Sequence, residues 1–162
     1  MGKTLVIYYS AQGHTKRAAE LVAKTLNADL FGIELKEPYT EADLDWTNPE
    51  ARATMQFNGE RDLDDLAVSE APNWAEYENV ILGYPIWWGY AAFPMTTFVA
   101  QNSFKDKTVH LFCTSHSSGI GDSDIKLRYR TANDCKVWHE AVRFFQDAPE
   151  KEITDWVKSL EI

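Results

Sequence analysis

The sequence predicts an α/β fold in which helices cover both faces of a parallel sheet. Short apolar runs alternate with longer stretches whose apolar residues recur at helical spacing. The runs are almost continuously apolar, which is typical of strands buried on both faces. A chain of 162 residues with 44% hydrophobic content suits one globular domain. We therefore expect a single doubly wound α/β domain over residues 1–162.

Five apolar runs are the expected strands, at residues 4–9, 30–35, 80–84, 109–113 and 137–144. About five helices are expected between and after them. The first crossover repeats Ala18, Leu21 and Val22 at helical spacing, and the last helix repeats Ile153 and Trp156.

The segment between the second and third strands, residues 36–78, is longer than one crossover helix requires, and it is rich in Asp and Glu. One helix is expected near residues 49–58, with Asn48 as its N-cap and Pro49 in its first turn. Long excursions of this kind often act as functional flaps. A solvated acidic loop held by a few aromatic residues explains the composition equally well, so both interpretations remain open.

The charge balance restricts the partners. The net charge is −9, from 16 basic and 25 acidic residues, so the protein repels nucleic-acid backbones and anionic lipid surfaces. No apolar stretch approaches the ~20 residues of a transmembrane helix, and we expect a cytoplasmic protein without nucleic-acid or membrane partners. Cys113 and Cys135 lie in no metal-binding spacing and are expected to be buried free thiols.

The loop after the first strand carries the residues of a phosphate cradle. Ser10 and Thr15 supply hydroxyl donors, and Gly13 allows the backbone to approach an anion closely. The loop opens a helix near Thr15, and a helix start offers unpaired N–H groups and roughly half a positive charge. The same residues also suit an ordinary helix cap.

The loop after the third strand, residues 83–94, contains adjacent tryptophans. Pro85 fixes the backbone, Gly89 frees it again, and Ile86, Trp87 and Trp88 form an apolar projection between them. We expect at least one of the two indoles to face a cleft and to stack on a flat aromatic ligand, although a place in the core is the alternative. The remaining tryptophans are expected to matter less for binding: Trp46, Trp74, Trp138 and Trp156.

The loop after the fourth strand, residues 112–124, is rich in hydroxyls and glycines, and His116 stands in its middle. Its N–H groups and short polar side chains suit the polar edge of a heteroaromatic ring. A serine-rich helix cap with a solvated histidine is the simpler alternative. All three loops are expected at the carboxyl edge of the sheet, where doubly wound proteins bind ligands.

The segments YYSAQGHTKRAAE, GYPIWWGYAAFPMTTFV and FCTSHSSGIGDS together resemble the flavodoxin family, of the short type, over nearly the whole chain. The resemblance implies a three-layer flavodoxin-like fold with strand order 2-1-3-4-5 and noncovalently bound flavin mononucleotide (FMN). It implies that three groups of residues contact the cofactor. On this resemblance, the phosphate group is held by Ser10, Gln12, Gly13, His14 and Thr15. One side of the isoalloxazine ring is lined by Pro85, Ile86, Trp87, Trp88 and Gly89, and its pyrimidine edge is lined by Thr114, Ser115, His116, Ser117 and Gly119.

Two functions compete on this basis. An electron carrier needs bound FMN and an acidic surface that docks basic faces of redox partner proteins, which the net charge suits. The alternative is a quinone or nitro reductase that uses NAD(P)H directly. A phosphoacceptor signalling domain would need acidic residues where Tyr9, Ser10 and Tyr84 stand. We favour the carrier, in which no catalytic side chain or metal takes part, and the oligomeric state stays open.

Overall fold

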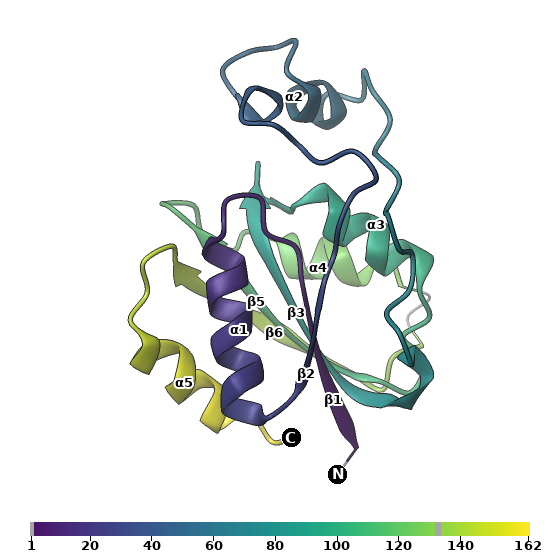
Figure 1. Cartoon of the computed structure of the whole chain (residues 1–162), viewed down its shortest axis with the longest axis vertical. Helices are drawn as coiled ribbons and strands as arrows, with labels where there is room; N and C mark the ends of the chain where they lie inside the picture. Colours follow the sequence, from purple (N-terminus) through teal and green to yellow (C-terminus); the bar gives the residue numbers. More distant parts are fainter. Residues whose placement is uncertain (1, 132–133) are drawn as a thin grey trace.

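The computed structural model describes residues 2–131 and 134–162, and its centre is a parallel sheet (Figure 1). The sheet order is β2-β1-β3-β5-β6. The strands are β1 (Lys3–Tyr8), β2 (Asp29–Gly32), β3 (Tyr77–Trp87), β5 (Thr108–Ser115) and β6 (Val137–Phe145). The predicted doubly wound flavodoxin-like fold is confirmed.

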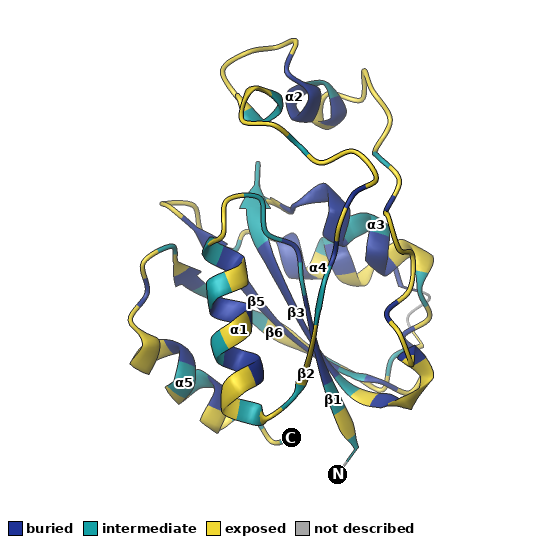
Figure 2. Ribbon diagram, viewed as in Figure 1, coloured by how far each residue is buried: buried dark blue, intermediate teal, exposed yellow. Residues whose placement is uncertain are grey.

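Helices cover both faces of the sheet, so the molecule has three layers (Figure 1). The helices α1 (His14–Leu26) and α5 (Glu150–Ser159) pack on one face, where Val6 is buried. The other face carries α3 (Phe93–Gln101) and α4 (Ser123–Arg128). Leu5 and Ile7 face that side, because successive residues of a strand point in opposite directions. Both sides of the central strands are therefore buried (Figure 2).

The sequence missed one short strand. β4 (Tyr90–Ala91) pairs antiparallel with the end of β3, so the numbering of the later strands moves up by one. Trp88 and Gly89 join the two strands with φ values of 50° and 78°. Positive φ at both central residues is what a type I′ hairpin turn requires. The expected apolar projection is therefore a hairpin that extends β3 beyond the sheet.

Residues 36–66 form a compact module, here called the roof, that stands above the carboxyl ends of the strands (Figure 1). Its two ends leave the sheet side by side, because Leu35 and Leu66 form an antiparallel bridge. The second strand was predicted to reach residue 35, but β2 ends at Gly32 and the chain then continues to the Leu35–Leu66 bridge. The roof contains a 3-10 helix, η1 (Ala42–Leu44), and the helix α2 (Arg52–Phe57).

The helix predicted at residues 49–58 begins later than expected. α2 begins at Arg52, after the N-cap Ala51. The Asn48 side chain instead accepts a hydrogen bond from the Glu50 backbone N–H at 3.0 Å, which is a turn that precedes the helix. Residues that suit a helix cap also suit such a turn, and pattern alone does not separate them.

A buried arginine holds the roof together. The Arg52 side chain is only 3% exposed, and its Nη2 lies 2.8 Å from Asp64 Oδ2. The same nitrogen donates to the Glu37 carbonyl oxygen at 2.7 Å, and the guanidinium lies over the Tyr39 ring, 4.3 Å from its centroid. These contacts join residues from both ends of the roof to α2. The long segment is therefore an ordered unit rather than a solvated loop.

The two cysteines differ in burial. Cys113 on β5 is buried, as predicted, and burial raises the pKa of its thiol to about 12. The prediction that Cys135 is buried is wrong, because this thiol is only partly buried. Neither cysteine forms a disulfide. Within residues 2–131 and 134–162, no helix combines the length and the apolarity that crossing a membrane would take.

Candidate binding site at the carboxyl edge of the sheet

A cavity of about 550 Å³ lies where the loops after β1, β3 and β5 meet beneath the roof. This is the edge predicted from the sequence. Twelve predicted residues line it: Ser10, Gln12, His14, Thr15, Pro85, Ile86, Trp87, Trp88, Thr114, Ser115, His116 and Ser117. The three predicted glycines, Gly13, Gly89 and Gly119, do not line the cavity and act on it only through the backbone.

The loop after β1 forms the polar part of the cavity floor. Gly13 has φ of 95° and is the N-cap of α1, so the helix begins at His14, one residue before the predicted Thr15. The Gly13 N–H donates to Ser10 Oγ at 3.0 Å, which closes the loop into a turn. No side chain caps the helix start. Its first N–H groups therefore remain available to an anion.

Hydrogen bonds connect the loops that form the cavity floor. Thr15 Oγ1 and Thr114 Oγ1 are hydrogen-bonded to each other at 2.7 Å, and both residues are buried. In the loop after β5, Ser115 Oγ donates to the Ser118 carbonyl oxygen, which also accepts from Arg143 Nη1 at 3.0 Å. These bonds fix the hydroxyl-rich loop against β6. His116 is exposed at its tip.

The two tryptophans of the hairpin have different surroundings. Trp87 makes edge contacts with Tyr9, Tyr39 and Phe93, at ring-centroid distances of 5.3–5.9 Å. Trp88 lies nearly parallel to Phe57 of the roof at 4.7 Å and to Phe93 at 6.2 Å. Both indoles line the cavity, but Trp88 also connects the roof to the hairpin.

The tyrosines around Trp87 contribute no charge. Burial raises the pKa of Tyr9 to about 12. Burial also raises the pKa of Tyr39, and the nearby Asp64 adds to that shift. Both phenols stay protonated at neutral pH, so the hairpin side of the cavity is uncharged.

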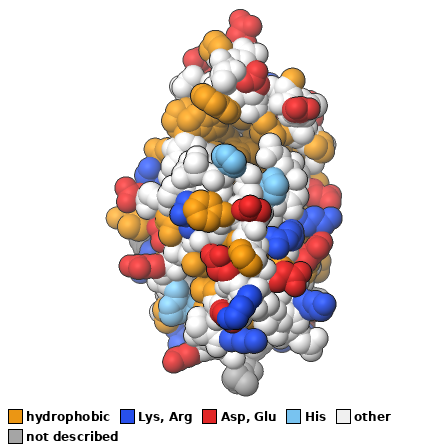
Figure 3. Space-filling model, turned by 90° about the vertical axis from the view of Figure 1, so that its left-hand side faces the viewer, with side chains coloured by type: hydrophobic (Ala, Val, Ile, Leu, Met, Phe, Trp, Pro, Cys, Tyr) orange, Lys and Arg blue, Asp and Glu red, His pale blue; other side chains and the backbone are white. Residues whose placement is uncertain are grey.

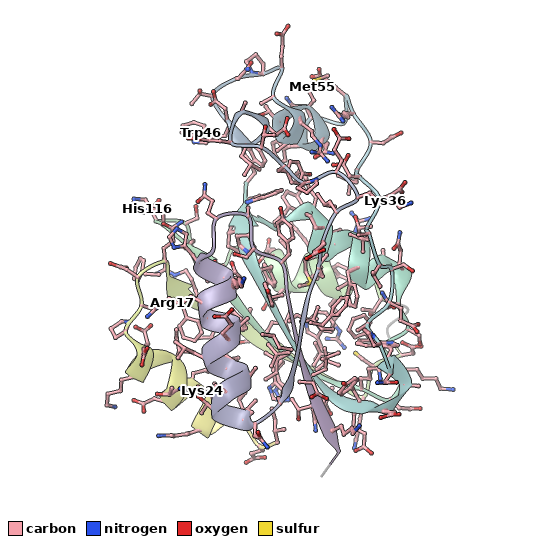
Figure 4. The ribbon with its side chains drawn as sticks, viewed as in Figure 1. Arg17, Lys24, Lys36, Trp46, Met55 and His116 are labelled. Atoms are coloured by element: carbon pink, nitrogen blue, oxygen red, sulfur yellow. The ribbon has the colours of Figure 1, made fainter. Side chains whose placement is uncertain are left out.

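The sequence missed the residues that the roof contributes to the cavity, which are Leu44, Trp46 and Ala53. It also missed Gln146, which follows β6. The available signal was an isolated tryptophan in an acidic segment, but nothing in the pattern placed that segment over the strand ends. Trp46 on the roof and His116 on the floor lie on opposite sides of the cavity mouth (Figure 4).

Charge is unevenly divided around the cavity. None of the described residues that line it is Asp or Glu, although the protein carries a net charge of −9. The roof holds nine acidic and three basic residues, a net charge of −6. Figure 3 shows two histidines beside the hollow, a hydrophobic rim above it and acidic side chains higher on the roof. The cavity floor is thus suited to an anion, and the outer roof is not.

A second hollow adjoins the floor and adds a cation. It is lined by His14, Arg17, His116, Gln146 and Asp147. Arg17 Nη2 donates to the Ala148 carbonyl oxygen at 2.9 Å, which holds the guanidinium beside the start of α1. Arg17 therefore places a positive charge near the loop after β1, with the Asp147 carboxylate lining the same hollow.

The fold is that of a doubly wound α/β protein, and its cavity lies at the carboxyl ends of the strands, which is where proteins of this class bind ligands. The flavodoxin family model matches residues 3–160, and the chain belongs to the flavodoxin family.

Solved structures share this fold. A candidate flavoprotein from Bacteroides eggerthii is 36% identical, with a TM-score of 0.87, and the match covers 100% of this chain and 99% of that one. One from Bacteroides uniformis is 33% identical, with a TM-score of 0.88 and coverage of 98% and 99%. A flavoprotein from Lactobacillus acidophilus, solved in complex with FMN, is 24% identical, with a TM-score of 0.70 and coverage of 96% and 99%.

Proposed function

We propose that this protein binds FMN in the cavity and transfers electrons to and from partner proteins. The observation that supports the cofactor is the chemistry of the floor. In a protein of net charge −9, the cavity has no carboxylate among its described lining residues, and it has an uncapped helix start beside hydroxyl groups. Such a donor set suits a phosphate dianion. The Lactobacillus acidophilus flavoprotein, which shares the fold, was crystallised with FMN.

The parts of the cavity suit the parts of the cofactor. Ser10, Thr15 and the backbone around Gly13 would hold the phosphate group, with Gln12 and His14 beside them. The apolar hairpin residues would flank the flavin ring, and the hydroxyl-rich loop after β5 would meet its polar edge. When bound, FMN supplies the redox chemistry, and the protein binds, orients and shields it.

The observation that supports a carrier is the position of the negative charge. The roof, with its net charge of −6, stands at the mouth of the cavity, where a redox partner must approach the flavin. A partner with a basic docking surface would be attracted to this face, and the attraction would be screened by salt.

The second candidate is a reductase that uses NAD(P)H directly to reduce quinones or nitro compounds. The exposed indole of Trp46 at the cavity mouth favours it, since a flat small molecule finds a stacking surface there. The charge of the roof opposes direct binding of an anionic dinucleotide.

One assay separates the two. The FMN-loaded protein is mixed anaerobically with NADH or NADPH, and flavin bleaching is followed with and without a basic flavoprotein reductase. We expect negligible bleaching by the nucleotide alone, and reduction by the reductase that slows as salt rises. Rapid turnover with a quinone and nucleotide alone would overturn the carrier.

Charge-reversal variants give the matched control. The double change Glu41→Lys and Glu50→Lys on the roof should slow reduction by the basic reductase several-fold at low salt and weaken its salt dependence. The double change Glu152→Lys and Glu161→Lys makes the same charge change on exposed residues in α5 and just after it, away from the roof, and it should have little effect. Equal effects at both places would contradict docking through the roof.

A further inference from the structure

Trp46 differs from every other tryptophan in the protein. The other five, Trp74, Trp87, Trp88, Trp138 and Trp156, each pack against aromatic rings. Across the described chain, Trp46 has no ring contact and no hydrogen bond, and it is 71% exposed. It nevertheless lines the cavity. Because exposing an indole forfeits the free energy of burying it, this residue is better explained by a ligand than by the fold.

The loop that carries Trp46 is ordered by its own hydrogen bonds. Asp45 Oδ1 accepts from the Thr47 hydroxyl at 2.6 Å and from the Thr47 N–H at 3.0 Å. These bonds hold the pKa of Asp45 below its ordinary value. The Asp45 carbonyl oxygen accepts from Thr54 Oγ1 of α2 at 3.3 Å. The indole is therefore presented from a fixed loop, which lowers the entropy cost of stacking on it.

The roof is itself held in place over the cavity. Arg52 connects α2 to both ends of the roof, through Asp64 and the Glu37 carbonyl. Phe57, the last residue of α2, stacks on Trp88 and so joins the roof to the hairpin. Two other roof residues, Leu44 and Ala53, continue the apolar wall beside Trp46. Above the polar floor there is therefore a preformed apolar wall that faces the cavity.

The negative charge of the roof restricts the kind of ligand that can bind against it. Its net charge of −6 disfavours anions, and an indole face attracts electron-poor rings. A phosphate-bearing molecule is thus directed to the floor, and an uncharged, electron-poor planar ring is suited to the wall.

We propose that Trp46 and the apolar wall of the roof form a second ligand subsite, distinct from the cofactor floor, that binds a neutral planar electron-poor ring such as a quinone. The subsite rests on the proposed FMN binding, because the floor must be occupied for the remaining space to be a slot beside the flavin. The proposed subsite is the same whether the electrons come from a protein or from a nucleotide.

The test measures binding rather than turnover. Oxidised FMN-loaded protein is titrated with 2-methyl-1,4-naphthoquinone by equilibrium dialysis, in the absence of any reductant. Trp46→Ala should weaken quinone binding about tenfold while leaving FMN affinity and the melting temperature unchanged. Trp46→Phe, which keeps a ring, should recover most of the binding. Tyr129→Ala, at an aromatic residue that is 73% exposed on the far side of the hairpin, is the control and should bind quinone normally.

Each other outcome counts against the subsite. If Trp46→Ala weakens FMN binding as much as quinone binding, the indole covers the cofactor and the second subsite is wrong. If the wild type retains FMN but binds no quinone, or if all three variants bind it equally, this inference fails and the proposed cofactor stands. If the protein does not retain FMN on gel filtration, both proposals fall.

Discussion

The floor and the roof of the cavity are built in opposite ways. The floor consists of loops that each follow a buried parallel strand, and its donors are backbone N–H groups and short hydroxyl side chains. The roof contributes no strand to the sheet, and it is organised around one buried arginine and a few ring contacts. The floor can therefore position a ligand with backbone groups and short side chains, whereas the stability of the roof depends on a small number of individual residues. Mutations should consequently act locally and severely in the roof, and through ligand binding in the floor.

The largest expected effect is the loss of the buried arginine. Arg52→Met leaves the Asp64 carboxylate without its ion-pair partner and the Glu37 carbonyl without its hydrogen-bond donor, and removing one member of a buried pair costs about 3–5 kcal/mol. We expect this loss in the roof, as faster amide hydrogen exchange across residues 36–66 with the sheet unchanged.

Arg61→Met is the matched control, because Arg61 is an exposed arginine of the same module. It should alter neither exchange nor thermal unfolding. Identical exchange profiles for the two variants would show that the roof does not depend on Arg52.

The interior of the sheet should show a pH effect that comes from a buried histidine. His110 on β5 is 5% exposed and its ring stacks on His139 at 4.2 Å. Burial, followed by the neighbouring His139, lowers the pKa of His110 to about 4. The folded state therefore resists protonation that the unfolded chain accepts. The resulting stability is fully present above pH ~6.5 and is lost as the pH falls towards 4, by up to about 3 kcal/mol.

Urea unfolding between pH 7 and pH 4 tests this effect. His110→Phe keeps a ring against His139 but cannot titrate, so its stability should fall less steeply than that of the wild type. Parallel pH profiles for the two proteins would remove His110 as the cause.

One glycine in the floor and one in the roof allow a direct comparison of the two regions, with a smaller expected loss of stability. Gly13 has φ of 95° and Gly59 has φ of 76°, and a Cβ added at either position meets no atom within 4 Å. Alanine at each should therefore cost a similar backbone strain, about 1–2 kcal/mol. Only Gly13→Ala should also weaken FMN binding, because it alters the backbone at the start of α1. Calorimetry with FMN distinguishes the two variants, and equal loss of affinity would place the cofactor elsewhere.

The sequence predicted the floor well because its determinants are local. A buried strand followed by glycine and hydroxyl residues, then by a helix, specifies both the turn and its place at the sheet edge. The pattern at residues 10–15 carries this information without any long-range contact.

The roof could not be predicted in the same way. Arg52 acts through Asp64 and the carbonyl of Glu37, which lie 12 and 15 residues away in the chain. An arginine in an acidic segment looks like a solvated residue until those partners are placed around it. The type I′ turn was missed for a related reason, since Trp88 is not a residue that normally adopts positive φ. Its stacking between Phe57 and Phe93 accompanies that conformation.

The most direct test of the account is the affinity of the protein for FMN relative to riboflavin. The two molecules share the flavin ring and differ in the phosphate, so the ratio isolates the floor around Ser10, Gly13 and Thr15. Charge-assisted hydrogen bonds to the phosphate should make FMN bind roughly 100-fold more tightly, as measured by tryptophan fluorescence quenching. Equal affinity for the two ligands would contradict a phosphate-binding floor.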